Sequence, residues 1–209
     1  MKTIITMRKL TLFCFFTLFQ LAFGQAVFLK LGNNITHYQY TENNINMRSE
    51  PGGSYELGYK KFVPQSSYPG LYYTVGLMIN NFNQVAGSET SLYRWRTTYM
   101  GINGNVGFRI YKNRESNFIS NIVFGMGINK FLKGTQTTNN SLYDLKGTHD
   151  FNKIFIQPSF GLEGIYNVNN EVFISVGYNY SKTFNFKSGG DENLNFVNNN
   201  FFIGTYIAL

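Results

Sequence analysis

The stretch that decides the fold is KIFIQPSFGLEGIY-NVNN-EVFISVGYNYSKTFNF, residues 153–186. Along its first arm, apolar and aromatic side chains occupy most even positions from Ile154 to Tyr166, whereas Gln157 and Glu163 stand at odd positions. The second arm, which follows four turn residues, keeps the same alternation. Because neighbouring side chains of a strand point to opposite faces, each arm has one apolar and one polar face. The stretch therefore predicts a β-hairpin whose arms are long enough to cross a bilayer as tilted strands.

The same alternation recurs along the rest of the chain and predicts eight strands in total. The connections after the first, third, fifth and seventh strands are long and polar, whereas the other connections are short. Long loops at one end and short turns at the other are typical of outer-membrane barrels. The predicted fold is therefore all-β, an eight-stranded antiparallel up-and-down transmembrane β-barrel. The predicted strands cover residues 26–40, 54–63, 71–82, 98–111, 118–132, 153–166, 171–186 and 195–209.

The first residues of the chain have the pattern of a secretory signal peptide. A basic start precedes an apolar run from Leu10 to Phe23, and Ala22 and Gly24 supply the small residues of a cleavage site. We expect a signal peptide over residues 1–24 and an outer-membrane barrel domain over residues 25–209, with an uncleaved N-terminal anchor as the alternative. An even number of strands then places both termini of the barrel in the periplasm.

The composition is rich in aromatic residues and poor in charge, with 18% Phe, Trp and Tyr against 14% Asp, Glu, Lys and Arg. The mean hydropathy is only −0.19. A membrane barrel explains this combination, because one whole face of each strand is apolar while the average stays near zero. The positive charges are scattered, which argues against a nucleic-acid-binding face. A soluble secreted β-sandwich is the competing fold.

The polar faces of the predicted strands carry charges of both signs, which a closed barrel would bury in its lumen. Buried charges are costly unless they are paired, so we expect Arg109 or a lumen lysine to contact Glu163 or Glu56. An eight-stranded barrel is just wide enough for side chains to fill it. A packed core is therefore expected, with a narrow pore or a small ligand cavity as the alternative. The predicted lumen network consists of Lys30, Glu56, Lys60, Arg109 and Glu163.

The apolar faces carry aromatic residues near the ends of the strands, where membrane barrels have interfacial girdles. The alternative explanation is the general preference of aromatic residues for strands. The predicted girdle residues are Tyr55, Tyr73, Phe118, Tyr166, Tyr178 and Tyr180.

No catalytic, cofactor-binding or metal-binding motif stands out in the sequence. His149 and Asp150 are adjacent in a polar loop, and His37 falls on the lipid side of the first strand. Catalysis would require a nucleophile, a base and an orienting acid held together, and no nucleophile motif accompanies these histidines. We therefore predict a non-enzymatic protein without a cofactor. Its polar loops are candidate sites for a protein partner, and they cover residues 41–53, 83–97, 133–151 and 187–194.

In the order and spacing of these segments, the chain resembles the small outer-membrane β-barrel proteins of Gram-negative bacteria, and its layout is similar to that of OmpX-, OmpW- and OmpA-type barrels. PSFGLEGIY (158–166) and SVGYNYS (175–181) are the most typical segments, and the Asn-, Lys-, Tyr- and Phe-rich style resembles barrels from the Bacteroidetes. The resemblance implies a monomer in the cell outer membrane, in contact with its lipid and lipopolysaccharide. It implies a structural, surface-interaction or secretion-accessory role. A narrow channel or carrier for small or apolar solutes and a lipid-modifying enzyme are the alternatives.

Overall fold

The computed structural model describes residues 26–39, 47–63, 70–88, 91–113, 117–138, 141–146, 148, 151–185 and 194–209. The strands of these residues belong to a single antiparallel sheet. In this part of the chain, no helix is long and apolar enough to span a membrane. The predicted signal peptide, and most of the predicted loop 187–194, lie outside the described residues.

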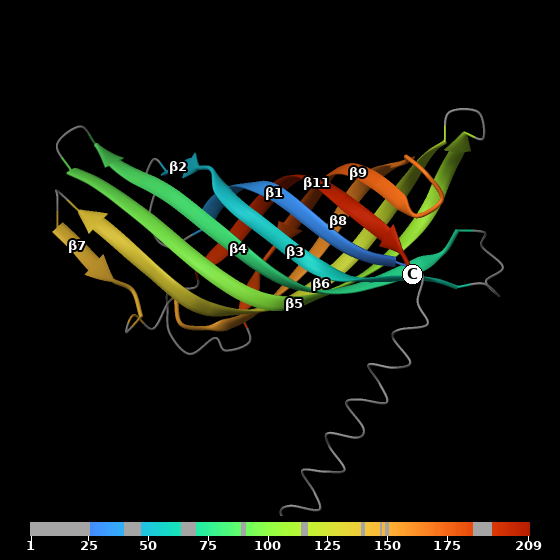
Figure 1. Ribbon diagram of the computed structural model, residues 1–209. Helices are drawn as coiled ribbons and strands as arrows, with labels where there is room; N and C mark the ends of the chain where they lie inside the picture. Colours follow the sequence, from blue (N-terminus) through green and yellow to red (C-terminus); the bar gives the residue numbers. More distant parts are fainter. Residues whose placement is uncertain are drawn as a thin grey trace, which may run out of the picture.

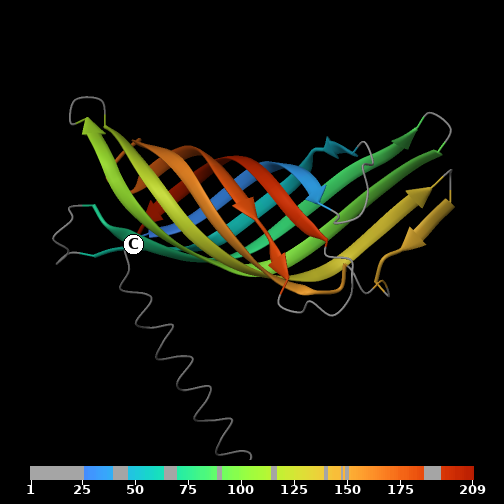
Figure 2. The ribbon, with the colours of Figure 1, turned by 180° about the vertical axis from the view of Figure 1, so that it is seen from behind.

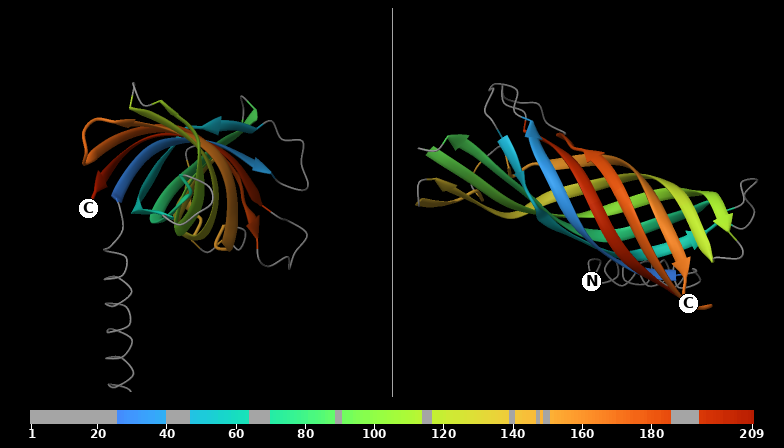
Figure 3. Two further views of the ribbon diagram at one scale, coloured as in Figure 1. Left: turned by 90° about the vertical axis from the view of Figure 1, so that its right-hand side faces the viewer. Right: turned by 90° about the horizontal axis from the view of Figure 1, so that it is seen from above.

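Eight of the described strands form a closed barrel (Figures 1 and 3). Each strand is antiparallel to its neighbours, and the last strand returns to pair with the first, from Ala208 opposite Ala26 to Asn195 opposite Gln39. This closure leaves no open sheet edge in the wall, and it confirms the predicted eight-stranded up-and-down barrel. The strands of the wall are β1 (Ala26–Gln39), β3 (Gly52–Phe62), β4 (Tyr72–Ser88), β5 (Ser91–Asn113), β6 (Phe118–Thr138), β8 (Ile154–Asn167), β9 (Val172–Lys182) and β11 (Asn195–Ala208).

Three short strands extend this wall. β2 (Met47–Glu50) pairs with β4, β7 (Ser141–Asp144) pairs with β6, and β10 (Phe184–Asn185) pairs with β8. Pro51 separates β2 from β3, since proline has no amide hydrogen to give to a ladder. All three short strands therefore add to existing wall strands and do not form a separate domain.

The hairpin of residues 153–186 has the predicted pairing. β8 and β9 are in register, with Ser159 opposite Ser181 at one end of the ladder. Leu162 is half exposed on the outside of the barrel, whereas the next residue, Glu163, is buried in the lumen. The alternation in the sequence therefore assigns the two faces of this hairpin correctly.

Three of the predicted loops are wrong in part, because described residues within them belong to strands, including residues 93–97, for which an extension of the next strand is an expected alternative. β4 and β5 stay paired until Ser88 lies opposite Ser91, so the predicted loop 83–97 is a β-hairpin. The predicted loop 41–53 contains β2 and the start of β3, and the predicted loop 133–151 contains the end of β6 and all of β7. The alternation of apolar and polar residues weakens in these segments because the outward face of each strand meets water beyond the bilayer. The backbone continues to pair, and the inward face of β4 stays buried at Gln84 and Ala86.

Beyond the closed wall, β2, β7 and the outer ends of β4, β5 and β6 form an open sheet, which we call the protruding sheet (Figures 1 and 2). β8 pairs with β6 only between Phe118 and Lys130 of β6. The outer end of β6, from Thr135 to Thr138, pairs with β7 instead. The protruding sheet thus has β2 at one edge and β7 at the other. One row of paired residues across it consists of Arg48, Val85, Arg94, Thr137 and Leu142.

Candidate functional site

The outer face of the barrel is a continuous apolar band. One row of paired residues crosses five adjacent strands and consists of Leu29, Leu57, Leu77, Ile102 and Ile128. Each of these side chains exposes between 47% and 62% of its surface. An apolar surface of this extent is not left facing water in a soluble protein, and a closed ladder pairs the backbone groups of the wall internally. The barrel is therefore built to span a membrane.

The predicted girdle residues lie on strands of the wall, three of them toward each end of the barrel. Phe118 is paired directly with Tyr166 at the end of the barrel that carries the chain termini, and Tyr73 lies at the same end. Toward the other end, the hydroxyl of Tyr178 donates a hydrogen bond to Asn199 Oδ1 at 2.6 Å. A ring with an apolar body and a polar tip suits the boundary between lipid and water. The other residues toward that end are Tyr55 and Tyr180.

Inside the barrel, an aromatic cluster that we call the outer plug fills the lumen where the protruding sheet begins. Tyr99 lies within it, with its ring centroid 4.7 Å from that of Phe155 and 5.4 Å from that of Phe131. Its hydroxyl donates to the carbonyl oxygen of Phe151 at 3.1 Å, which ties a connecting segment to the plug. The outer plug consists of Tyr38, Phe82, Tyr99, Phe131, Leu145, Phe151, Phe155, Leu194 and Phe196.

Amide side chains line the lumen next to the outer plug. Asn34 Oδ1 accepts hydrogen bonds from Asn198 at 3.0 Å and from Asn200 at 2.5 Å. Asn34 Nδ2 donates to Asn80 Oδ1 at 3.2 Å, so these contacts join β1, β4 and β11 across the interior. A second chain of hydrogen bonds joins β6, β8 and β9, through Asn129, Gln157 and Ser181.

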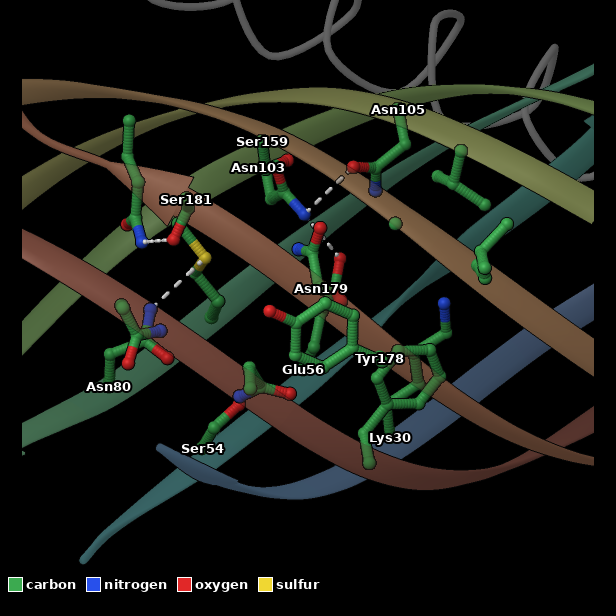
Figure 4. Close-up of a pocket in the computed structure, with 18 residues that line it drawn as sticks. Lys30, Ser54, Glu56, Asn80, Asn103, Asn105, Ser159, Tyr178, Asn179 and Ser181 are labelled. Carbon is green, nitrogen blue, oxygen red and sulfur yellow. Dashed lines mark hydrogen bonds between the residues drawn. The ribbon is translucent and has the colours of Figure 1, made fainter. Parts of the chain in front are cut away.

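A small cavity of about 60 Å³ lies among these polar side chains (Figure 4). Its lining includes Lys30, Glu56, Asn103 and Asn105. One water occupies about 10–15 Å³ of such a volume and needs two to four polar partners, so the cavity has room for roughly four waters. A cavity of this size hydrates the interior but does not hold a larger solute.

Glu163 is the centre of a charged cluster nearer the chain termini. The residue is 1% exposed. Its carboxylate lies 3.0 Å from Lys30 Nζ and accepts hydrogen bonds from the hydroxyls of Tyr206 at 2.6 Å and Tyr72 at 3.1 Å. Three donors, from β1, β11 and β4, thus meet one carboxylate of β8. Hydrogen bonds to an ionised group are the strong ones, and they offset the cost of burying this charge.

Lys60 lies beside the same cluster without a carboxylate contact of its own among the described residues. Its Nζ is 3.8 Å from the ring centroid of Tyr72 and 4.6 Å from that of Tyr206. These are the two tyrosines that donate to Glu163. The electron-rich ring faces attract the ammonium group, so the tyrosines connect the second lysine to the carboxylate.

The other two predicted members of the lumen network have different surroundings. Glu56 lies opposite Lys30 in the β1–β3 ladder and accepts a hydrogen bond from Asn103 at 3.0 Å. Arg109 is half-buried and packs over Gly70, and its Nε has no hydrogen-bond partner among the described residues. The structure therefore gathers the two lysines and the two glutamates and leaves Arg109 apart.

A second apolar cluster, the inner plug, fills the lumen on the side of the chain termini. The rings of Phe28 and Tyr206 lie 5.5 Å apart within it. With a plug at each end and a cavity of about 60 Å³ among the polar side chains, side chains fill most of the described lumen. The inner plug consists of Ala26, Phe28, Ile165 and Tyr206, with Ile119 and Phe173 packed against it.

Two features of the lumen have no clear signal in the sequence: the tyrosine partners of Glu163 and the outer plug. The alternation places Tyr72 and Tyr206 on the inner face of the wall, but it does not identify them as partners of Glu163. Such contacts across the lumen depend on the stagger between strands, which no local pattern encodes. The outer plug includes Leu145 and Phe151, which belong to a polar segment. Only the inward aromatic residues at the same level of several strands could have indicated this plug.

Of the residues considered for catalysis, His149 and Asp150 lie outside the described residues. Ser49 Oγ lies 3.0 Å from His37 Nδ1 and 3.4 Å from His37 Nε2. Because the hydroxyl is at a similar distance from both ring nitrogens, it is in line with neither, and this geometry does not suit proton transfer. No group of three potential metal ligands occurs among the described residues.

The closed eight-stranded wall, its apolar outer band and its filled lumen define the class of protein: the chain is a small β-barrel of the outer-membrane type. Similar solved structures include Neisserial surface protein A, with 11% identity over 88% of this chain and 99% of that chain, and a TM-score of 0.49. OprG from Pseudomonas aeruginosa has 11% identity over 89% and 96% of the two chains, and a TM-score of 0.48. The N-terminal β-barrel domain of OprF from the same organism has 6% identity over 89% and 98%, and a TM-score of 0.45. No protein family model matches the chain, and no curated protein matches it in sequence.

Proposed function

We propose that the protein is a non-enzymatic surface-interaction protein of the cell outer membrane, in which the barrel anchors the protruding sheet and the sheet binds a protein partner. Both termini then lie in the periplasm and the protruding sheet lies outside the cell. The observation that carries this proposal is the outer edge of the sheet. All four residues of β7 are exposed, including Leu142 at 70% and Tyr143 at 55%.

The edge strand offers two kinds of contact to an extended segment of a partner. Within the described residues, β7 pairs with β6 only, so its other side presents unpaired backbone groups. An extended peptide can add to such an edge through main-chain hydrogen bonds, while alternate side chains provide specificity. Leu142 and Tyr143 point to opposite faces of the sheet, so an added strand would find one large exposed side chain on each face.

The packed lumen supports an anchoring role and speaks against the alternative of a channel. Plugs at both ends and a cavity of about 60 Å³ between them leave no wide path among the described residues. The alternative of a lipid-modifying enzyme would need a nucleophile aligned with a base. The contact of Ser49 with His37 does not supply that alignment.

A peptide selection tests the proposal directly. Peptides of about twelve residues are selected from a displayed library against the folded barrel in detergent, and their affinities are measured for the Leu142→Lys/Tyr143→Lys variant. Charged side chains on an edge strand oppose strand addition, so the affinity should fall at least tenfold. Leu92→Lys, which changes another exposed leucine of the protruding sheet, is the matched control and should leave the affinity within about twofold. Equal binding to wild type and to the β7 variant would refute recognition through this edge.

A further inference from the structure

Positively charged side chains gather on one side of the outer wall, directly above the apolar band. They extend outward from β2, β5 and β6, and their positions follow from the strand registers, with Lys130 opposite Met100, Lys133 opposite Thr98, and Arg94 opposite Val85. We propose that this cluster, which we call the basic patch, binds the phosphate groups of the lipid headgroups that surround the barrel. The proposal rests on the outer-membrane location proposed above. The basic patch consists of Arg48, Arg94, Arg96, Lys130 and Lys133.

The height of the patch matches the headgroup layer. On β5 the outward residues of the apolar band run from Ile110 to Met100, which corresponds to about 34 Å of strand and, at a tilt near 45°, to about 24 Å across the membrane. This is the height of the apolar band of an outer-membrane barrel. Lys130 stands in the row of Met100, at the upper boundary of that band. Each further pair of residues rises by about 5 Å, so Lys133 and Arg96 reach the level of the phosphates.

The charge balance of the patch favours an anion. Glu50 is the carboxylate within the patch, and it lies 3.6 Å from Arg94 Nε and 3.3 Å from Arg96 Nη2. Asp144, on β7, lies opposite Thr135, which is itself opposite Arg96. Five cations thus face two carboxylates. Because a guanidinium has five donors in a fixed plane, each arginine that contacts Glu50 retains donors for a second anion.

Glu50 also orders the patch before any ligand arrives. It brings the side chains of Arg94 and Arg96 to a single carboxylate, although they are two positions apart on β5. Ordering of long side chains is a major cost of binding. Because Glu50 already orders Arg94 and Arg96, a ligand loses less free energy to their ordering. Arginine is well suited to phosphate because its planar group can form two parallel hydrogen bonds.

The opposite side of the wall lacks a comparable cluster among the described residues. At similar levels β1 and β11 present Ile35 and Asn199 to the outside, and Lys182 on β9 lies 5.8 Å from the ring centroid of Phe184. A general attraction of a basic protein to an anionic membrane would not require this asymmetry. The arrangement indicates that one flank of the barrel selects phosphate-bearing lipid.

The test uses the full-length barrel, folded in a zwitterionic detergent, with bound lipid counted by native mass spectrometry. The probes are lipid A with two phosphates, lipid A with one phosphate, and inorganic pyrophosphate. Wild type should bind the two-phosphate lipid at least tenfold more tightly than the Arg96→Gln/Lys133→Gln variant does. The affinity of wild type for the one-phosphate lipid should lie between these two affinities, and added salt should weaken lipid binding. Lys61→Gln/Lys112→Gln, which removes the same charge near the opposite rim, is the matched control and should bind like wild type.

Three outcomes would overturn the proposal: equal lipid binding by the Arg96→Gln/Lys133→Gln variant, an equal loss in the control variant, or pyrophosphate binding as tight as that of lipid A. Heat-modifiable gel migration verifies that each variant is folded. The Arg96→Gln/Lys133→Gln variant and its control leave β7 unchanged, so the peptide-binding assay can be run on them as well. Loss of peptide binding in the β7 variant alone therefore tests the proposed function, and loss of lipid A binding in the patch variant alone tests the basic patch.

Discussion

The Glu163 carboxylate, at the centre of the charged cluster in the lumen, should be a main source of barrel stability, and Glu163→Gln removes its charge without changing its shape. The native carboxylate lies 3.0 Å from Lys30 Nζ and accepts hydrogen bonds from two tyrosine hydroxyls. Glutamine fills the same volume, so no cavity is created. The amide oxygen can still accept from one hydroxyl, but the amide nitrogen now faces donors.

The expected loss follows from the charge that remains. The side chain of Lys30 is only 10% exposed, and Glu163→Gln leaves its ammonium group without a carboxylate contact. Removal of one member of a buried ion pair costs about 3–5 kcal/mol. A further change of Lys30 to Met removes the stranded charge. The double variant Lys30→Met/Glu163→Gln should therefore recover at least half of the loss, which a double-mutant cycle measures as coupling.

The free energy of unfolding can be measured by urea titration of the barrel folded into lipid vesicles, with the fluorescence of Trp95 as one probe and gel migration as another. Glu171→Gln, in the exposed turn between β8 and β9, is the matched control, and it should change stability by less than about 0.5 kcal/mol. A loss of less than about 1 kcal/mol for Glu163→Gln would refute the argument. So would a double variant that is less stable than the single one.

Two further predictions concern the packing of the lumen. Gly107→Ala should destabilise the barrel by about 1–3 kcal/mol, because a methyl group there overlaps the ring of Tyr72 and displaces its hydroxyl from Glu163. Gly104→Ala, on the outer face of the same strand, meets no atom within 4 Å and should be neutral or slightly stabilising in the same unfolding assay, so equal losses would contradict the role of Tyr72. The purified protein should carry no steady current in planar bilayers, and reproducible single-channel steps would restore the narrow channel as the function.

The sequence predicts the wall of the barrel well, because a transmembrane strand must present lipid on one side and a small lumen on the other. Each strand from β1 to β11 that crosses the apolar band therefore shows the alternation in its own residues. The same reasoning fails at the protruding sheet. Val85 and Trp95 belong to paired strands, but the outward face of the sheet here meets water instead of lipid. Outward positions such as Arg94 and Arg96 therefore need not be apolar, and the segment has the composition of a loop.

The lumen cluster is predictable only in part, for a geometric reason. The alternation of side chains along each strand places Lys30 and Glu163 in the lumen. Since buried charges are costly unless paired, inward cations and carboxylates are expected to meet. Which ones meet depends on the height of each residue in the closed barrel, and that height is the sum of the staggers of all intervening strands. Arg109 stands at an inward position of β5, but it lies near a turn beside Gly70. It therefore remains outside the cluster that contains both glutamates.

The polar lumen also explains how a closed barrel can hold an open sheet in a fixed position. Asn34 accepts from two asparagines of β11 and donates to Asn80 of β4, so these contacts require one register among three strands. A slip of one strand by one residue would turn its inward amides toward lipid, where an unsatisfied polar group is costly. The register of β4 in the wall sets the register of β4 in the protruding sheet, because the strand is continuous from Tyr72 to Ser88. The hydrogen-bonded interior of the barrel therefore also fixes the position of β4 in the protruding sheet, whose edge strand β7 is proposed to bind a partner.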